Sequence, residues 1–397
     1  MPAQPREETD PTRRALLRGA ALAPVAALVA ACEASTPTAT PTPAETSGRT
    51  AGRPASTSPA SGPSATPTTS AVRRGPGAPR TLTTGIEVPW NIVFLPDGDA
   101  LVSSRDTGRI VHVTRAGRKR VVATVPGVVS NVDQGGEAGL LGLALHPRFA
   151  TEPWLYVYHS TSSDNRVVRM RYRDGRLGRP RLLLDGIRTA VHHNGGGLAF
   201  GPDGHLFVST GDAESSASAQ DRTSLNGKIL RVADTGRTPR GNPFGNPVWT
   251  YGHRNVEGLA FDGQGQLWAS EFGDQAKDEL NRIERGGNYG WPAVEGADGP
   301  GGYRDPLVTW DTDACSPSGI AILHGRAWLG ALQGECVYSV VLRGPDRGRV
   351  RRYVEGHGRI RAVASAPDGS LWVGTSNRDG RGTPRAGDDR ILRVAFS

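Results

Sequence analysis

Residues 198–209 read LAFGPDGHLFVS: a short apolar run, a Pro-Asp-Gly turn and a second apolar run. Proline and the Asp-Gly pair favour tight turns between antiparallel strands, so this stretch predicts a β-hairpin. Close copies stand at residues 93–103 (VFLPDGDALVS) and 363–374 (VASAPDGSLWVG), with a further one at residues 259–270 (LAFDGQGQLWAS).

The hairpin recurs along most of the chain, with copies beginning near residues 93, 143, 198, 259, 320 and 363. These spacings of roughly 40 to 60 residues are typical of propeller blades. Additional strand-like runs follow several copies, at residues 109–113, 228–232 and 390–394. No amphipathic helical stretch of useful length competes with them. A β-sandwich is the alternative, but it would not require so regular a period. The sequence therefore predicts an all-β fold, a six-bladed β-propeller over residues 80–397.

The N-terminal part has a different composition. Residues 1–31 begin with a charged stretch that ends in the pair Arg13 and Arg14, followed by an interrupted apolar run. This pattern predicts a twin-arginine signal peptide. Small residues precede Cys32, which predicts a lipidated cysteine and an exported protein, anchored at the outer face of the cell membrane or else periplasmic or extracellular. The alternative is an ordinary signal peptide with a chance cysteine.

Residues 32–79 are rich in Pro, Thr, Ser and Ala and almost free of large apolar side chains. Such a segment cannot offset its ordering entropy by burial, so we expect a disordered stalk. The lipid anchor would then be the only attachment to the membrane.

The formal net charge of +8 raises the question of nucleic-acid binding. The arginines look scattered and the predicted export removes this partner, so we expect no nucleic-acid binding. Cys315 and Cys336 remain as an even pair in an oxidising compartment, which predicts a disulfide. Two unpaired core cysteines are the alternative.

Several polar segments are not needed by the hairpin pattern, and they stand at the ends of the predicted strands. They read GEAGLLG (136–142), HHNGGGL (192–198), TGD (210–212), YGHRN (251–255), SEFGD (270–274), GNYGWP (287–292) and GRIR (358–361). Loops from several blades converge at one mouth of a propeller, so we expect these segments to form one site.

Taken together and in this order, the segments resemble the glucose/sorbosone dehydrogenase family, from about Val88 to Val394. Its members are soluble aldose dehydrogenases that use pyrroloquinoline quinone (PQQ). The resemblance implies oxidation of an aldose at C1 to a lactone, hydride transfer to the quinone, and delivery of the electrons to an external acceptor.

The resemblance also implies the catalytic residues. His193 aligns with the family's general base, and histidine titrates near the pH that this task requires. Asp212 matches the carboxylate that orients the base, at the far end of the strand that His193 enters. The role of His192 is left open.

The cofactor carries three carboxylates, so its pocket is expected to be cationic. The residues that match the family's cofactor contacts are Arg254, Asn255, Arg359 and Arg361, and the last two would share one face of a strand. Glu137 and Gln333 depart from the family pattern, in which a glutamine and a lysine contact the cofactor. A carboxylate at position 137 is unfavourable beside an anion unless it is protonated or paired.

The family uses Ca²⁺ to polarise the quinone. Gly273 and Asp274 match the pair whose backbone carbonyls hold that ion, whereas Glu279 and Tyr289 match a second, structural calcium site. An ordinary exposed acidic loop is the alternative.

Two other functions are compatible with a propeller. The changed pocket positions would suit a catalytically weakened module that binds carbohydrate or protein. A calcium-dependent lactonase-type hydrolase would require acidic and amide ligands around the channel, where this sequence supplies arginines and a histidine.

Overall fold

The computed structural model describes residues 75–397. The predictions for the signal peptide, for Cys32 and for residues 33–74 of the stalk lie outside this range. Residues 75–79, which we predicted as stalk, belong to the fold instead, since the amide of Gly77 donates to the carbonyl of Ala395 at 2.7 Å. No helix among the described residues is long and apolar enough to span a bilayer.

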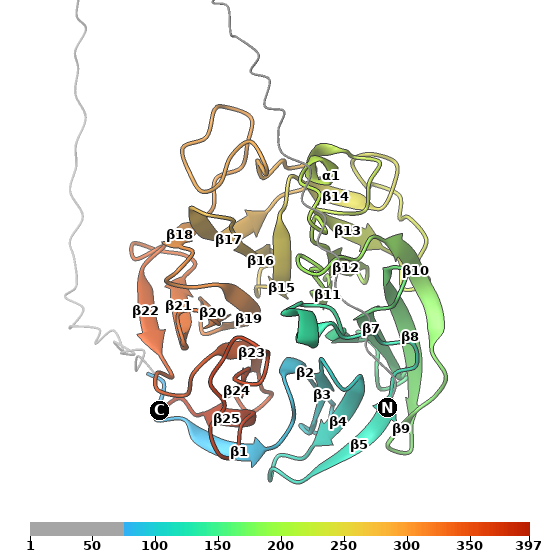
Figure 1. The fold of residues 1–397 in the computed structure, drawn as a ribbon, viewed down its shortest axis with the longest axis vertical. Helices are drawn as coiled ribbons and strands as arrows, with labels where there is room; N and C mark the ends of the chain where they lie inside the picture. Colours follow the sequence, from blue (N-terminus) through green and yellow to red (C-terminus); the bar gives the residue numbers. More distant parts are fainter. Residues whose placement is uncertain (1–74) are drawn as a thin grey trace, which may run out of the picture. The chain divides into compact units, whose positions relative to one another are not determined.

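The described chain forms six antiparallel sheets arranged as blades around a centre, as Figure 1 shows. The prediction of a six-bladed β-propeller is confirmed.

The first three blades contain these strands in chain order: β2 (Pro89–Phe94), β3 (Ala100–Ser104), β4 (Arg109–Val113) and β5 (Lys119–Thr124); β6 (Leu140–Leu145), β7 (Trp154–Ser160), β8 (Asn165–Arg173), the short β9 (Arg176–Leu177) and β10 (Arg181–Ile187); β11 (Leu198–Phe200), β12 (Leu206–Ser209), β13 (Lys228–Val232) and β14 (Val248–Tyr251).

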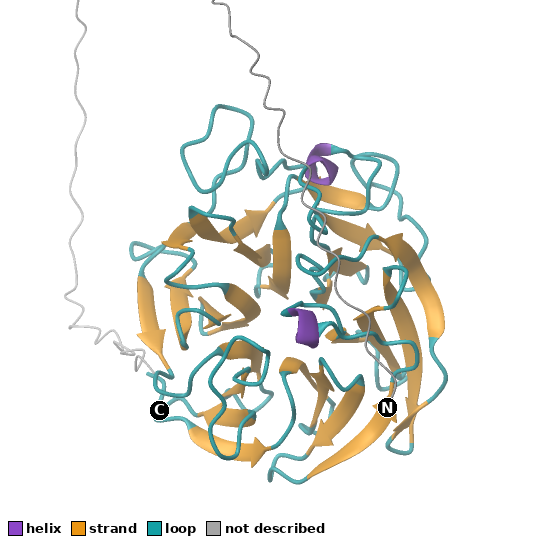
Figure 2. Ribbon diagram, in the orientation of Figure 1, coloured by secondary structure: helices purple, strands orange, loops and turns teal. Residues whose placement is uncertain are grey.

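The other three blades contain β15 (Asn255–Phe261), β16 (Leu267–Phe272), β17 (Lys277–Ile283) and β18 (Val308–Asp311); β19 (Pro317–Leu323), β20 (Arg326–Ala331), β21 (Cys336–Val341) and β22 (Val350–Tyr353); β23 (Ile360–Ser365), β24 (Leu371–Thr375) and β25 (Arg390–Val394), together with β1 (Arg80–Thr84). Two short helices, η1 (Val132–Gln134) and α1 (Ala217–Gln220), lie in connections (Figure 2).

The ring is closed by β1, which pairs antiparallel with β25 and becomes the outermost strand of the last blade. Arg80 lies opposite Arg393, and Thr84 lies opposite Arg390. The two ends of the described chain are therefore joined in one sheet, so that the last blade cannot separate from the first without breaking a ladder of backbone hydrogen bonds.

The alternation of side chains along each strand explains how the blades pack. In β12, Leu206 and Val208 pack in one cluster with Tyr156 of the preceding blade. Phe207 points to the other face and packs with Val256 of the following blade. Because successive strand residues face opposite sides, one apolar strand contributes to two interfaces between blades.

Cys315 and Cys336 are both buried in the fifth blade as free thiols. The structure thus has the unpaired alternative, without the disulfide that we predicted between them. Both side chains pack in the apolar cluster that contains Trp268 and Leu329.

Candidate functional site

A polar cavity of about 450 Å³ opens at one end of the propeller. Loops from five of the six blades contribute side chains to it. Its lining residues are Glu137, His192, His193, Arg254, Phe272, Gly273, Asp274, Asp278, Thr312, Ser316, Leu332, Gln333, Arg359, Arg361 and Arg381. Most of the residues predicted for the site are therefore brought together.

His193 and Asp212 lie at the same end of the third blade. His193 precedes β11, and Asp212 follows β12, the antiparallel neighbour of β11. We had placed both residues on one strand, but the chain turns at residues 201–205 and returns. His193 Nδ1 consequently lies 2.8 Å from Asp212 Oδ1. The imidazole is partly exposed to the cavity, whereas the carboxylate is buried.

Asp212 has two further partners. Trp291 Nε1 donates to Oδ2 at 2.8 Å, and the amide of Glu214 donates to Oδ1 at 2.9 Å. Burial would raise the pKa of Asp212, but the hydrogen bond and charge of His193 and the bond from Trp291 hold that pKa below its usual value. The carboxylate is thus ionised and fixed in orientation near neutral pH. The neighbouring His192 faces Glu214, with 2.7 Å between Nδ1 and Oε1.

The left-handed backbone at His193 (φ 57°) turns its amide away from the ring's partner. That amide donates to Glu137 Oε2 at 2.9 Å. The same oxygen accepts a hydrogen bond from Asn255 Nδ2 at 3.3 Å. Glu137 therefore helps to hold the loop that carries the candidate base.

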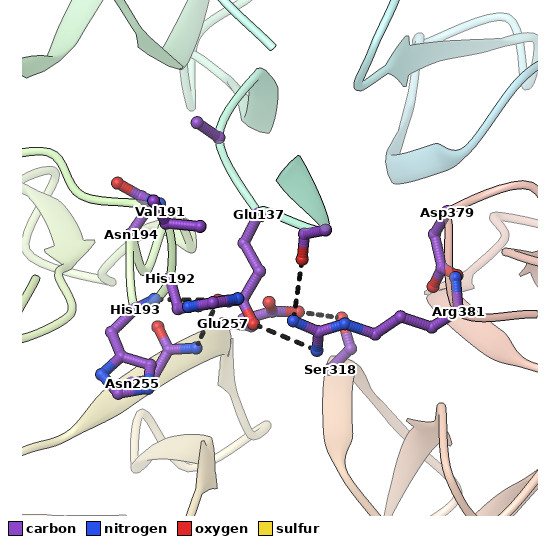
Figure 3. Close-up of polar contacts among 12 residues, drawn as sticks. Glu137, Val191, His192, His193, Asn194, Asn255, Glu257, Ser318, Asp379 and Arg381 are labelled. Atoms are coloured by element: carbon purple, nitrogen blue, oxygen red, sulfur yellow. Dashed lines mark hydrogen bonds and ion pairs between the residues drawn. The ribbon is translucent and has the colours of Figure 1, made fainter. Parts of the chain in front are cut away.

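Arg381 was not recognised from the sequence. It lies in the connection between β24 and β25 and reaches across the cavity (Figure 3), where its Nη2 donates to the carbonyl of Gly135 at 2.9 Å. Its Nη1 lies 3.5 Å from Glu137 Oε1. Burial would raise the pKa of Glu137, but Arg381 and the amide of His193 lower it below its usual value. The carboxylate that departs from the family pattern is therefore ionised and paired.

Arg359 and Arg361 share one buried carboxylate, as expected for residues on one side of a strand. Asp379 Oδ2 lies 2.9 Å from Arg359 Nε and 3.7 Å from Arg361 Nη2. Arg361 Nη1 also donates to Glu257 Oε2 at 2.6 Å. Asp379 and Glu257 carry no sequence signal of their own, since their partners are set by the path of distant loops.

Arg254 lies at the start of the fourth blade, with its Nη2 bonded to Asp274 Oδ1 at 2.7 Å and its guanidinium over the Trp291 ring. Its Nε is buried without a hydrogen-bond partner among the described residues. A buried unpaired donor on a cation indicates a place for an anionic acceptor. The cavity contains four arginines, and this donor set fits a ligand that carries several carboxylates.

The two predicted cofactor residues with amide side chains, Asn255 and Gln333, differ from each other in burial. Asn255 is fully buried, and its Oδ1 accepts a hydrogen bond from the amide of Gly195 at 2.9 Å. It therefore connects the loop after His193 to the fourth blade. Gln333 lies at the cavity and is exposed. Its backbone N–H donates to the carbonyl of Cys315 at 3.1 Å.

The loop of Gly273 and Asp274 is held from behind by Glu295, which the sequence did not point to. Glu295 Oε1 accepts the amides of Ala276 and Lys277, each at 3.1 Å, and also the amide of Asp274. Asp278 lies at the cavity, where burial raises its pKa to about 7 against hydrogen bonds from the amides of Ser316 and Gly273. A nearby cation would stabilise the ionised form of such a carboxyl group.

A second acidic cluster lies behind this loop. Asn281 Nδ2 donates to Glu271 at 3.0 Å and to Glu279 at 2.8 Å, while Asn281 Oδ1 is buried without a partner among the described residues. Burial and the charge of Glu271 raise the pKa of Glu279 to about 8. Carboxylate and amide oxygens in this arrangement fit a hard cation such as Ca²⁺.

Tyr289 takes part differently from the prediction. Its hydroxyl donates to the carbonyl of Arg282 at 2.7 Å and accepts from the amide of Glu284 at 2.8 Å. The phenol is thus occupied by the backbone, and its ring stacks on His253 at 4.5 Å. The phenol hydroxyl is not a free ligand for an ion.

Comparison with known proteins agrees with this geometry. The family described as glucose/sorbosone dehydrogenase matches residues 86–392. The structure resembles the PQQ-bound form of aldose sugar dehydrogenase from Streptomyces coelicolor, with 46% sequence identity, a TM-score of 0.78, and coverage of 82% of this chain and 99% of that one.

Two relatives are similar in sequence. The aldose sugar dehydrogenase of Escherichia coli is 30% identical over 74% of this chain and 89% of its own length. Quinoprotein glucose dehydrogenase B of Acinetobacter calcoaceticus is 32% identical over 56% of this chain and 54% of its own length.

The match extends across all six blades and includes every loop that lines the cavity. It favours an enzyme over the binding module and over the hydrolase. The chain therefore belongs to the glucose/sorbosone dehydrogenase family and is a PQQ-dependent oxidoreductase of the sugar dehydrogenase class.

Proposed function

We propose that this enzyme oxidises aldoses at C1 to lactones, with His193 as general base and with Ca²⁺ assistance. The observation that carries the proposal is the His193–Asp212 pair at 2.8 Å, at the edge of a cavity lined by arginines. When bound, PQQ accepts the hydride that leaves C1.

The hydrogen bond to Asp212 sets the tautomer of His193. Because the ionised carboxylate can only accept, Nδ1 carries the proton and Nε2 keeps a free lone pair. Nε2 then takes the proton of the C1 hydroxyl, and Asp212 stabilises the imidazolium that results. A positioned base of this type typically contributes a factor of about 10² to 10⁴ in rate.

The cofactor would be held by Arg254 on one side and by Arg359 and Arg361 on the other. Each guanidinium already has a carboxylate partner, which fixes its orientation before the ligand binds. Arg381 neutralises Glu137, and this removes the objection that a carboxylate at this position would repel the cofactor. Gln333 lies where it can supply an amide in place of a charged contact.

A catalytic Ca²⁺ would be held at the loop of Gly273 and Asp274, through backbone carbonyls. Glu295 supports this assignment because it holds the amides of the same loop from the other side. Asp278 adds a carboxyl group beside the loop. For the second ion, Glu279 is the proposed ligand.

We further propose that the enzyme acts outside the cytoplasm, attached through a lipid on Cys32 and a stalk that ends before residue 75. It would pass its electrons to an external acceptor there. The sequence pattern of residues 1–31 supports this proposal.

The test uses the full-length chain, reconstituted with PQQ and Ca²⁺. We expect reduction of an electron-accepting dye when aldoses are added, and formation of the lactone. His193→Ala should lower the turnover number about 10²- to 10⁴-fold while PQQ still binds. The partly exposed His205, remote from the cavity, gives the matched control His205→Ala, which should retain activity.

Absence of dye reduction with every aldose, in protein that binds PQQ, would contradict C1 oxidation. Unchanged activity of His193→Ala would exclude this residue as the base. Full activity after removal of Ca²⁺ by a chelator would contradict the metal assignment alone.

A further inference from the structure

The arginines of the folded part look scattered in the sequence, but many of them gather on one surface of the structure. Residues 166–181 contain seven arginines and a single acidic residue, Asp174. This segment forms β8, β9 and β10 on the outer side of the second blade (Figure 1). Of the seven, Arg166 is paired with Asp164 at 2.6 Å, and the others make no ion pair among the described residues.

The first blade extends this surface. The start of its outer strand β5 follows Arg118 and includes Lys119 and Arg120. Arg120 Nη1 donates to the carbonyl of Gly175 at 2.8 Å, so the two segments are in contact. We call the combined surface the basic rim, which consists of the exposed residues Arg118, Lys119, Arg120, Arg171, Arg173, Arg176, Arg179 and Arg181.

None of these eight side chains forms an ion pair with a carboxylate of residues 75–397. Nearby carboxylates have other partners: Asp99 lies 3.2 Å from His112, and Glu152 lies 2.6 Å from Arg148. Like charges at this density repel one another and destabilise the free protein. An anionic partner that binds this surface would relieve the repulsion.

Apolar side chains lie among these charges. Among the described residues, three large hydrophobic side chains are exposed: Val121, Val129 and Leu182. Val121 follows Arg120 in β5, and Leu182 follows Arg181 in β10. The Trp154 ring carries the guanidinium groups of Arg171 and Arg181 over it, at 5.7 and 5.3 Å. Basic residues interspersed with exposed apolar and aromatic ones are typical of surfaces that contact lipid headgroups.

The position of the basic rim leaves the active site open. β8 begins at Asn165, whose side chain donates to Asn194 beside His193. It ends at Arg173, roughly 26 Å further along the strand at about 3.3 Å per residue. A partner that binds at the Arg173 end of this strand would not cover the cavity.

The basic rim also lies beside the strand that follows the proposed stalk. Lys119 Nζ donates to the carbonyl of Gly85 at 2.7 Å, and also to that of Thr84 at the end of β1. The chain thus passes the basic rim only at the end of β1, and it enters the fold at residues 75–77, where the amide of Gly77 donates to the carbonyl of Ala395 at 2.7 Å.

We propose that the basic rim binds the phosphate headgroups of anionic phospholipids and orients the propeller on the membrane with its active site accessible. A lipid on Cys32 alone gives attachment without orientation, whereas a polybasic surface adds a second, directional contact.

The test uses the full-length chain with Cys32→Ala, so that no acyl chain contributes. Binding is measured by co-sedimentation with vesicles of equal parts phosphatidylglycerol and phosphatidylcholine, and with vesicles of phosphatidylcholine alone. We expect binding only to the first, weakened when NaCl is raised from 50 to 500 mM because salt screens the contact.

The triple variant Arg171→Gln, Arg176→Gln and Arg181→Gln should lower the partition coefficient about 10- to 100-fold. A matched control, Arg285→Gln, Arg347→Gln and Arg351→Gln, removes the same charge from exposed arginines of the fourth and fifth blades and should change it less than threefold. Leu182→Ser should also weaken binding, because it removes apolar contact without any change in charge.

Equal losses in the two triple variants would overturn the proposal, since overall charge would then explain the binding. So would the absence of binding to anionic vesicles, or tighter binding to duplex DNA than to these vesicles at the same salt concentration. Dye reduction by the reconstituted triple variant should be unchanged, which separates a failure of this proposal from a failure of the catalytic one.

Discussion

The Asp212 carboxylate holds the His193 ring from the side opposite to the nitrogen that would meet the substrate, with 2.8 Å between Nδ1 and Oδ1. It also accepts a hydrogen bond from Trp291, so its own orientation does not depend on His193. The base is thus oriented before any sugar binds, which lowers the entropic cost of reaching the reactive geometry.

We expect Asp212→Asn to lower the turnover number at least about 10²-fold, because an amide can donate to Nδ1 and favour the tautomer that has its proton on Nε2. The Michaelis constant and PQQ affinity should change little. Steady-state kinetics and cofactor titration measure both. Asp305→Asn, at an exposed position outside the cavity, is the control, and normal turnover in Asp212→Asn would refute the orienting role.

The ion pair between Glu137 and Arg381 should be visible in cofactor affinity. Arg381→Gln leaves an ionised carboxylate beside the anionic cofactor, and we expect PQQ to bind about tenfold more weakly. Because Arg381 is 46% exposed, the effect should be at the lower end for a charged contact. Titration of the apoprotein measures the affinity.

The double variant provides the control for this pair. When Glu137→Gln is added to Arg381→Gln, neither residue of the pair carries a charge, and the affinity for PQQ should recover. If the two substitutions are additive in free energy, the residues act independently and the interpretation of the pair is wrong.

Lys228 should make stability depend on pH. Its ammonium is fully buried and bonded to three backbone carbonyls, those of Ser218, Ala219 and Asn226, at 2.6 to 3.0 Å. Burial lowers its pKa to about 7. Above that pH the folded protein loses this proton while the unfolded chain keeps it up to about pH 10.5. The free energy of unfolding should therefore rise with pH between 7 and 10, by up to about 1.4 kcal/mol per pH unit.

The measurement is the difference in unfolding free energy between the wild-type protein and Lys228→Met, followed from pH 6 to pH 10. The variant lacks the titrating group, so the difference should grow in favour of the wild type. Lys277→Met, at an exposed position, should show no such trend. A difference that stays constant with pH would mean that Lys228 keeps its proton.

Glu279 should couple calcium to stability. Its pKa is raised to about 8 by burial and by the charge of Glu271, so without a cation Glu279 mostly holds a proton near neutral pH, and a bound cation would favour its ionised form. We expect Ca²⁺ to raise the melting temperature of the wild-type protein at pH 8, and a chelator to reverse this. Glu279→Gln should abolish the shift, while Glu87→Gln, at an exposed position, should retain it. A calcium-dependent shift that persists in Glu279→Gln would place the ion elsewhere.

The six blades were within reach of the sequence because they depend on local signals, whereas the pairing of His193 with Asp212 was expected from the resemblance to the family. Turn residues and alternating apolar positions define each hairpin, and a hairpin returns the chain to the end where it began. The cofactor arginines were likewise expected from motifs that match the family. The pairing of residues 80–84 with the last blade could not be predicted, since a short polar-apolar run does not reveal its distant partner strand.

Tertiary structure alone decided which charges meet. Arg381 reaches Glu137 from a loop more than two hundred residues away, Asp379 lies between Arg359 and Arg361, and Glu295 holds the amides of the loop that begins at Gly273. The basic rim likewise required the contact between Arg120 and Gly175. Electrostatic interactions depend on separation in space, and closure of the ring sets those separations, whereas the sequence by itself specifies only the strands and turns from which the ring is built.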